Sequence, residues 1–237
     1  MVDFSDFDTR NYPTVDVRTG YAQWVGTYER TVEDAMDLAV LDRLTTPAWA
    51  EAARAADLGC GTGRTGAWLR TKAAPGLVLD GVDLTPEMLA VARGKAVHDS
   101  LTEADVTATG LPGGSYDLAV SSLIDEHLAD LGPLYREAYR LVRPGGRFVL
   151  VGLHPYFIMA AGMPTHFTGS GGGDIAITTH IHLVSDHLTA GLAAGWTLVE
   201  MAEAVVDDAW IALKPKWEKY RSHPVSAAYV WERKALG

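Results

Sequence analysis

The sequence has almost no cysteine and no long hydrophobic run. Its 237 residues include one cysteine, Cys60, so no disulfide can form within the chain and nothing indicates an oxidising compartment. The most apolar stretch, FVLVGLHPYFIMAAGM, is interrupted by His154 and Pro155 and is too short to cross a membrane. The opening MVDFSDFDTR is acidic and lacks the apolar segment of a signal peptide. We therefore expect a soluble, cytoplasmic protein with no membrane partner.

Positive charge is also scarce. Lysine and arginine total 20 against 30 aspartates and glutamates, and the formal net charge is −10. An acidic surface repels phosphate backbones, so we expect no nucleic-acid partner. The sequence has no internal repeat, and its nearest approach to low complexity is TGSGGGD at residues 168–174. A single domain is the simplest organisation for this length.

Hydrophobic patterns predict strands that alternate with helices. Strands are expected at residues 52–58, 76–84, 100–105, 116–124 and 147–153, and helices at 27–44, 63–72, 85–96 and 131–142. After an irregular stretch at 154–178, we expect a strand at 176–184, a helix at 185–195 capped by Ser185, and strands at 196–206 and 225–234. This order predicts an α/β fold with a doubly wound, mostly parallel sheet, helices on both faces and the late strands at its edge.

A glycine turn follows the first of these strands. Residues 57–63 read DLGCGTG, which places three glycines at alternate positions and Asp57 just before them. Glycines let a ligand approach the main chain closely. A dinucleotide turn has the spacing G-x-G-x-x-G, but here the residue after Gly63 is Arg64. Asp57 is a poor neighbour for a pyrophosphate and a good one for the ammonium group of S-adenosylmethionine.

Asp83 ends the next strand, 20 residues after Gly63. An acid at this place can bind both hydroxyls of a ribose. It therefore indicates a nucleoside, whether the ligand is a dinucleotide or S-adenosylmethionine. Taken one by one, the glycines also fit a plain tight turn, and Asp83 also fits the start of a helix.

Four motifs together distinguish these interpretations. DLGCGTG, GVDLTPEML, EADVTATGLPGGSYDLAV and LVRPGGRFVLV occur in an order and spacing that resembles the class I S-adenosylmethionine-dependent methyltransferases, in particular their ubiquinone/menaquinone-biosynthesis-like branch. The resemblance covers about residues 20–152 and implies a Rossmann-like sheet with S-adenosylmethionine as cofactor.

The resemblance also assigns residues to parts of the cofactor. It implies that the methionine part is held by Asp57, Gly59, Cys60, Gly61 and Gly63. It implies that Asp83 holds the ribose, that Thr85 and Met88 flank the adenosine, that Asp105 and Val106 meet the adenine edge, and that Ser121 and Ser122 pass beneath the methionine.

The acceptor is less well defined. The segment SLIDEH lacks the Asn/Asp-Pro-Pro-aromatic signature of amino-methyltransferases that act on DNA bases or protein glutamine. Aromatic residues gather before and after the cofactor core, which favours a small, partly apolar or aromatic acceptor. Oxygen is our first choice of acceptor atom, with nitrogen or carbon as alternatives. Two other functions stay open, an S-adenosylmethionine-binding protein that transfers no methyl group and an NAD(P)-dependent oxidoreductase.

Three histidines are candidate general bases, because a neutral imidazole is a competent base near pH 7. They are His154, which follows the fifth strand, His127, which follows the fourth, and His182. For each, a structural role is the alternative. His180 and His182 would share one face of a strand, but no acid-rich ligand set accompanies them, so we predict no metal site.

We divide the single domain into four parts. These are an N-terminal helical cap at residues 1–45, a cofactor-binding core at 46–152, an acceptor-site insert at 153–184, and a C-terminal helix with the last strands at 185–237. Nothing in the sequence indicates an oligomeric state.

Overall fold

A computed structural model describes residues 2–32 and 36–235. Its main sheet has seven strands in the order β4-β3-β2-β5-β6-β10-β9. The strands are β2 (Arg54–Leu58), β3 (Val78–Asp83), β4 (Ser100–Glu103), β5 (Tyr116–Ser122), β6 (Val142–Leu153), β9 (Thr197–Val205) and β10 (Pro224–Glu232). The first five run parallel, whereas β10 is antiparallel to both β6 and β9. The predicted α/β fold with late edge strands is confirmed.

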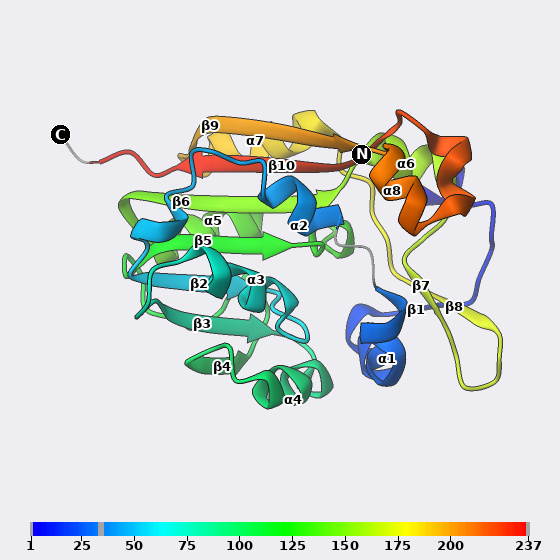
Figure 1. The fold of residues 1–237 in the computed structure, drawn as a ribbon, viewed down its shortest axis with the longest axis horizontal. Coiled ribbons are helices and arrows are strands. Elements are labelled where there is room, and N and C mark those ends of the chain that lie inside the picture. The colour runs from blue at the N-terminus through cyan, green and yellow to red at the C-terminus, as the bar shows by residue number, and fades with distance from the viewer. Residues whose placement is uncertain (1, 33–35, 236–237) are drawn as a thin grey trace.

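Helices cover both faces of this sheet (Figure 1). The described α-helices are α1 (Val17–Thr31), α2 (Met36–Leu41), α3 (Arg64–Lys72), α4 (Pro86–Lys95), α5 (Gly132–Leu141), α6 (Pro155–Ala161), α7 (Val184–Ala193) and α8 (Asp208–Leu213). Short 3-10 helices are η1 (Phe4–Asp6), η2 (Trp49–Glu51), η3 (Asp125–His127) and η4 (Pro215–Tyr220).

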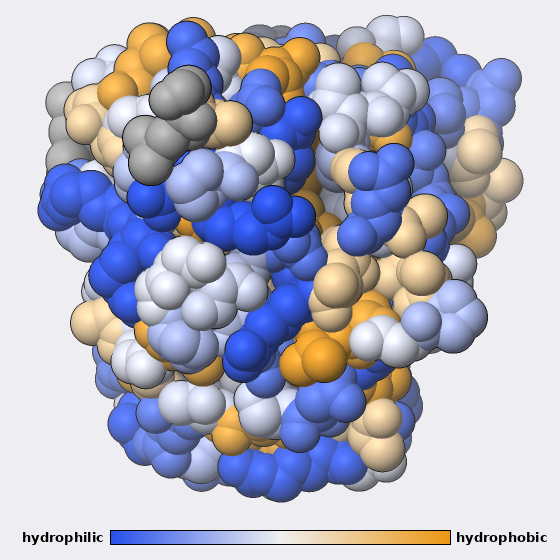
Figure 2. Space-filling model, turned by 90° about the vertical axis from the view of Figure 1, so that its left-hand side faces the viewer, coloured by the Kyte–Doolittle hydropathy of each residue, from blue (hydrophilic) through white to orange (hydrophobic). Residues whose placement is uncertain are grey.

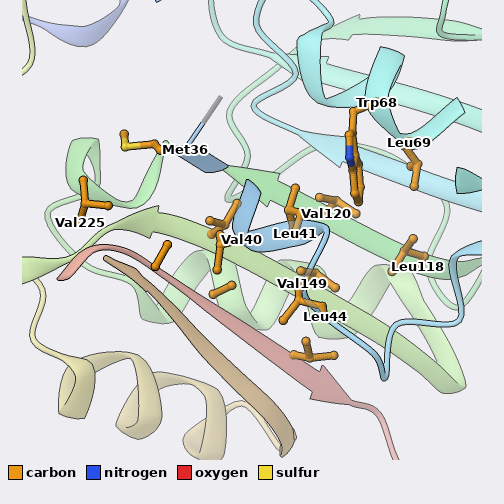
Figure 3. Packing of buried hydrophobic residues seen from close by; sticks show 14 of the residues in the cluster. Met36, Val40, Leu41, Leu44, Trp68, Leu69, Leu118, Val120, Val149 and Val225 are labelled. Atoms are coloured by element: carbon orange, nitrogen blue, oxygen red, sulfur yellow. The ribbon is translucent and has the colours of Figure 1, made fainter. Parts of the chain in front are cut away.

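Neighbouring side chains of the central strands point to opposite faces of the sheet, so each face has its own hydrophobic core. In β5, Val120 belongs to the cluster that includes α2 and α3, whereas its neighbour Ala119 belongs to the cluster that includes α5. Figure 3 shows Val40 and Leu41 of α2 lying over β5 and β6 in the first cluster. Each large side chain buried in this way contributes about 1.5–3 kcal/mol, so these two layers hold the sheet rigid beneath its loops.

Several elements outside the main sheet gather at the carboxyl ends of the parallel strands (Figure 1). There α1, α6 and α8 lie beside a small sheet with the order β1-β8-β7, made of β1 (Thr14–Val15), β7 (His166–Thr168) and β8 (Asp174–Ile177). Trp24 of α1 packs on Phe167 of β7, with ring centroids 5.9 Å apart. Segments distant in sequence thus form one cap over the end of the sheet where ligands dock in such folds.

The opposite end of the molecule is different. Figure 2 shows the face that lies at the amino ends of the parallel strands, where hydrophilic residues dominate and hydrophobic residues form small groups. Within residues 2–32 and 36–235, no helix is both long and apolar enough to cross a membrane.

The structure corrects four expectations about elements. The helix expected at 27–44 is divided, because α1 ends at Thr31 and α2 begins at Met36, with 33–35 outside the described residues. The stretch expected to be irregular, residues 154–178, contains α6, β7 and β8.

The strand expected at 176–184 ends at Ile177, so His180 and His182 do not share a strand face. Helix α7 begins at Val184, and Asp186, not Ser185, accepts the cap hydrogen bond from the main-chain N–H of Leu183 at 2.8 Å. The boundaries of the four predicted parts stay predictions.

Candidate active site

The glycine turn joins β2 to α3. The φ angles of Gly59, Gly61 and Gly63 are +75°, +51° and +86°, a region that strains any residue with a side chain. A Cβ at Gly59 would lie 2.5 Å from Ile124 Cγ2, whereas one at Gly61 would have no neighbour within 4 Å. The main chain at Gly61 is therefore open to the space in front of the turn.

Asp83 ties this turn to the next helix. Its Oδ2 accepts a hydrogen bond from the Gly61 N–H and its Oδ1 accepts one from the Thr85 N–H, both at 2.8 Å. Burial raises the pKa of Asp83, because the charged form loses solvent. A carboxylate has about four acceptor positions, so these two N–H groups do not use up its capacity to accept from a ligand.

A first cavity lies in front of the turn. Its walls are Val17, Tyr21, Tyr28, Gly59, Gly61, Asp83, Leu84, Thr85, Met88, Asp105, Val106, Ser122, Leu123, Ile124, His127 and Leu128. The structure thus brings together nine predicted residues: Gly59, Gly61, Asp83, Thr85, Met88, Asp105, Val106, Ser122 and His127. Among the described residues that line it are two carboxyl groups and no lysine or arginine.

Four predicted residues lie behind the turn instead. Asp57 Oδ2 accepts a hydrogen bond from His98 Nε2 at 2.9 Å, and both side chains are buried. Ser121 donates its hydroxyl to the main-chain oxygen of Leu58 at 2.9 Å. Gly63 precedes α3 as its N-cap residue, and Cys60 is buried, which raises the pKa of its thiol. These residues shape the turn and do not line the first cavity.

A second, larger cavity of about 460 Å³ adjoins the first. The two cavities share Tyr21, Tyr28 and Leu123. The walls of the second also include Trp24 and Phe157, the latter stacked on Trp217 with ring centroids 4.8 Å apart. Arg10, Lys214, Lys216 and Lys219 also line it, and its one carboxyl group within the described segments belongs to Glu126.

His127 lines the first cavity and contacts Tyr21, which lines both. Its Nδ1 lies 2.8 Å from the main-chain oxygen of Thr178, and its Nε2 lies 2.9 Å from the hydroxyl of Tyr21. Burial lowers the pKa of His127, which favours the neutral ring at pH 7.

The other two candidate bases lie away from both cavities. His154 is the N-cap of α6: its Nδ1 accepts from the Tyr156 N–H at 3.1 Å, and its Nε2 lies 2.9 Å from Glu203 Oε1. His182 donates from Nε2 to the main-chain oxygen of Leu128 at 2.7 Å. Neither side chain is brought to the first or second cavity, because each is engaged in holding a loop.

Sequence reasoning missed a buried carboxylate beneath the site. Asp37 of α2 accepts two hydrogen bonds from Arg64 at 2.7 and 2.8 Å and one from the hydroxyl of Ser122 at 2.6 Å. The sequence feature that pointed to it was Arg64, which stands where the dinucleotide pattern has a glycine and forms an ion pair with Asp37. Its buried partner could not be identified from spacing alone.

Glu126 and His98 were also missed. Glu126 is 4% exposed, and burial raises its pKa to about 8. His98 fills a space left by Gly66 and Gly81, where a Cβ would lie 2.6 and 2.8 Å from its ring. Within the described part of the chain, no group of three or more histidine, cysteine or acidic side chains could hold a metal ion.

Comparisons with known proteins agree with this geometry. Residues 56–150 match the family model described as a methyltransferase domain. The demethylmenaquinone methyltransferase of Thermus thermophilus is 37% identical over 106 residues, which are 43% of this chain and 48% of that protein. The malonyl-[acyl-carrier protein] O-methyltransferase of Enterobacter lignolyticus is 35% identical over 94 residues, 40% of this chain and 36% of that protein.

A solved structure extends the similarity. An S-adenosylmethionine-dependent methyltransferase from Mesorhizobium loti superposes with a TM-score of 0.67 and 26% identity, over 85% of this chain and 99% of that one. The chain spans half or less of the length of these two curated relatives. Its core is a class I S-adenosylmethionine-dependent methyltransferase domain. The resemblance to the menaquinone-biosynthesis-like branch is confirmed.

The first cavity fits the cofactor of this class. S-adenosylmethionine carries a ribose, an ammonium and a sulfonium but no phosphate. The wall offers Asp83 for hydroxyl groups and an open main chain at Gly61, and its two carboxyl groups, those of Asp83 and Asp105, disfavour a pyrophosphate. The expected cofactor is confirmed, and a dinucleotide is not favoured.

Proposed function

We propose that this protein transfers the methyl group of S-adenosylmethionine to a hydroxyl oxygen of a small, partly aromatic molecule. The observation that carries the proposal is the junction of the two cavities at Tyr21, Tyr28 and Leu123. One cavity suits the cofactor, and the other suits an acceptor that reaches the cofactor across this junction.

The cofactor side is built from main chain and carboxylates. In our proposal, the open turn at Gly59 and Gly61 holds the methionine part, Asp83 accepts from the ribose hydroxyls, and Asp105 and Val106 meet the adenine edge. When bound, S-adenosylmethionine supplies an activated methyl group, and the protein supplies position and electric field. Eight residues predicted for the cofactor line this one cavity, which supports these roles.

The acceptor side carries a group of aromatic side chains beside charged and aliphatic ones. Trp24, Phe157, Trp217 and Tyr220 line the second cavity, and flat rings stack well on such walls. Holding two reactants in line removes on the order of 7–11 kcal/mol of the barrier in favourable cases. We infer that these rings orient the acceptor and that His127, which contacts Tyr21 at the junction, is the base of this reaction.

Both relatives support methyl transfer, and the name of the second also supports oxygen as the acceptor atom. The Thermus thermophilus protein is named for demethylmenaquinone and the Enterobacter lignolyticus protein for O-methylation of malonyl-[acyl-carrier protein]. Both names describe acceptors outside nucleic acids. A carrier-bound acceptor is the alternative within the same chemistry.

Two measurements test the proposal. Calorimetry should give micromolar binding of S-adenosylhomocysteine and no comparable binding of NAD; the reverse result would overturn the cofactor assignment. Methyl-labelled S-adenosylmethionine should then label members of a panel of phenols and alcohols. Binding of the cofactor with labelling confined to amines, carbon acids or carrier-bound thioesters would reject the hydroxyl acceptor.

A further inference from the structure

Tyr21 is the residue through which the two cavities and His127 meet. It comes from α1, lines both cavities, and places its hydroxyl 2.9 Å from His127 Nε2. Its ring contacts that of His127 edge-on, with centroids 5.4 Å apart, and stacks on Trp24 at 5.8 Å. The hydroxyl is therefore held in one place by contacts on two sides.

The hydrogen bonds of His127 fix which nitrogen is basic. The main-chain oxygen of Thr178 can only accept, so Nδ1 carries the proton and donates to it at 2.8 Å. In the neutral ring Nε2 then carries the lone pair, and the Tyr21 hydroxyl donates to it. The basic nitrogen is covered by Tyr21, so a proton from the second cavity reaches His127 by way of the Tyr21 oxygen.

The groups around His127 can accommodate that proton. Glu126 Oε1 lies 3.6 Å from Nε2. Burial lowers the pKa of His127 and so does the charge of His180, whereas the hydrogen bond to Thr178 and the charge of Asp125 raise it. Burial raises the pKa of Glu126 to about 8, and its Oε2 has no partner among the described residues. A proton that arrives at His127 therefore lies close to a carboxyl oxygen of Glu126, which stabilises the positive charge.

We propose that Tyr21 is the catalytic residue that contacts the acceptor hydroxyl and that His127 acts through it as the final proton acceptor. This inference rests on the proposed function. As the acceptor oxygen bonds to the methyl carbon, the carbon–sulfur bond breaks and the sulfur keeps its electron pair. The acceptor proton moves to the Tyr21 oxygen, and the Tyr21 proton moves to His127 Nε2. The positive charge lost by the sulfonium ends as the proton on His127.

The relay defines the class of acceptor. It serves an oxygen that must lose a proton during transfer, such as a phenol or an alcohol. A carboxylate or an enolate already carries its charge and would gain nothing from it. The acceptors that depend on Tyr21 are therefore hydroxyl compounds.

One experiment needs no acceptor. A hydrogen bond donated to neutral His127 opposes its protonation, so Tyr21→Phe should raise the pKa of His127 in an imidazole NMR titration of the ligand-free protein. Tyr28→Phe is the matched control: Tyr28 lies on the same helix and lines both cavities, but no described residue accepts from its hydroxyl. This control should leave the His127 titration in place. An unchanged His127 pKa in Tyr21→Phe would overturn the contact.

The second experiment follows the reaction with whichever phenol the panel identifies. Tyr21→Phe and His127→Gln should each lower kcat by roughly 10²–10⁴-fold with KM changed a few-fold, and should remove the acid limb of the pH profile. Both variants should bind S-adenosylhomocysteine within a few-fold of the parent, because the proposal gives neither side chain a hydrogen bond to the cofactor. A parent that labels no hydroxyl compound would reject the proposed function, whereas an active parent with a Tyr21→Phe variant of similar kcat and unchanged pH profile would reject the relay alone.

Discussion

At the scale of single residues, an alanine substitution at Gly61 should have two effects, one on backbone strain and one on cofactor binding. Gly61→Ala places a methyl group at φ +51°, at a cost of about 1–2 kcal/mol in folding free energy. The methyl would also enter the first cavity, because nothing within 4 Å blocks it there. We therefore expect a modest loss of stability in urea together with at least tenfold weaker binding of S-adenosylhomocysteine by calorimetry.

Gly114 provides the control for this prediction. It also has a positive φ, +62°, and open space where an alanine methyl group would lie, but it is outside the first cavity. Gly114→Ala should lose similar stability and bind the cofactor product normally. Equal affinity in both variants would mean that no ligand approaches the main chain at Gly61.

Asp83 should control cofactor affinity more than folding. The proposed ribose contacts are charge-assisted hydrogen bonds worth roughly 1.5–3 kcal/mol each, so Asp83→Ala should weaken binding at least tenfold. The substitution also releases the N–H groups of Gly61 and Thr85, but both lie at a cavity where water can reach them. Circular dichroism should report an intact fold, and an unchanged dissociation constant would remove Asp83 from the site.

At the scale of elements, the Asp37–Arg64 pair joins α2 to α3. Asp37 is fully buried, and the Arg64 side chain is 21% exposed. Asp37→Ala leaves the guanidinium and the Ser122 hydroxyl without their partner, so we expect a loss of about 3–5 kcal/mol in urea unfolding. Asp37→Leu combined with Arg64→Met should lose less than the single substitution, because no buried charge stays unpaired.

A surface pair serves as the reference. Arg18 and Glu103 form an ion pair whose side chains are 51% and 45% exposed. Glu103→Ala should therefore cost less than about 1 kcal/mol. If Asp37→Ala costs no more than Glu103→Ala, the buried pair does not stabilise the fold.

The same elements reveal what sequence patterns can predict. The five parallel strands were predictable, because strands buried on both faces leave continuous apolar runs such as those of β5 and β6. The prediction of one helix at 27–44 was wrong. Its apolar stripe includes Val32, but α1 ends at Thr31, just before that residue. The hairpin of β7 and β8 was missed because its stability comes from packing on α1 and β1, which lie far away in the sequence.

At the scale of the whole molecule, the two halves of the site differ in how far sequence could predict them. The cofactor residues follow strand ends, and strand order brings those ends together. The acceptor side depends on contacts between distant segments, such as Tyr21 with His127, which are 106 positions apart. His154 follows a central strand as expected, yet its side chain turns to cap α6, since a histidine before a proline suits a helix start.

The pH dependence of the free energy of unfolding tests whether the buried Glu126 carboxyl group holds a proton in the folded protein. Burial raises the pKa of Glu126 from 4.5 to about 8, so the folded protein keeps a proton that the unfolded chain loses, and this contribution to stability falls as pH rises through that range. The pKa of His127 is lowered below 6.5, so its effect has the opposite sign and ends near 6.5. Between pH 6.5 and 8, only the Glu126 effect is left, and it lowers the free energy of unfolding by roughly 2 kcal/mol in total.

Urea unfolding should show the parent losing about this much relative to Glu126→Gln, which keeps the side-chain shape but cannot titrate. Parallel stability curves for the two proteins would mean that Glu126 is already ionised at pH 6.5 and that the carboxyl group beside His127 carries a full charge in the resting protein.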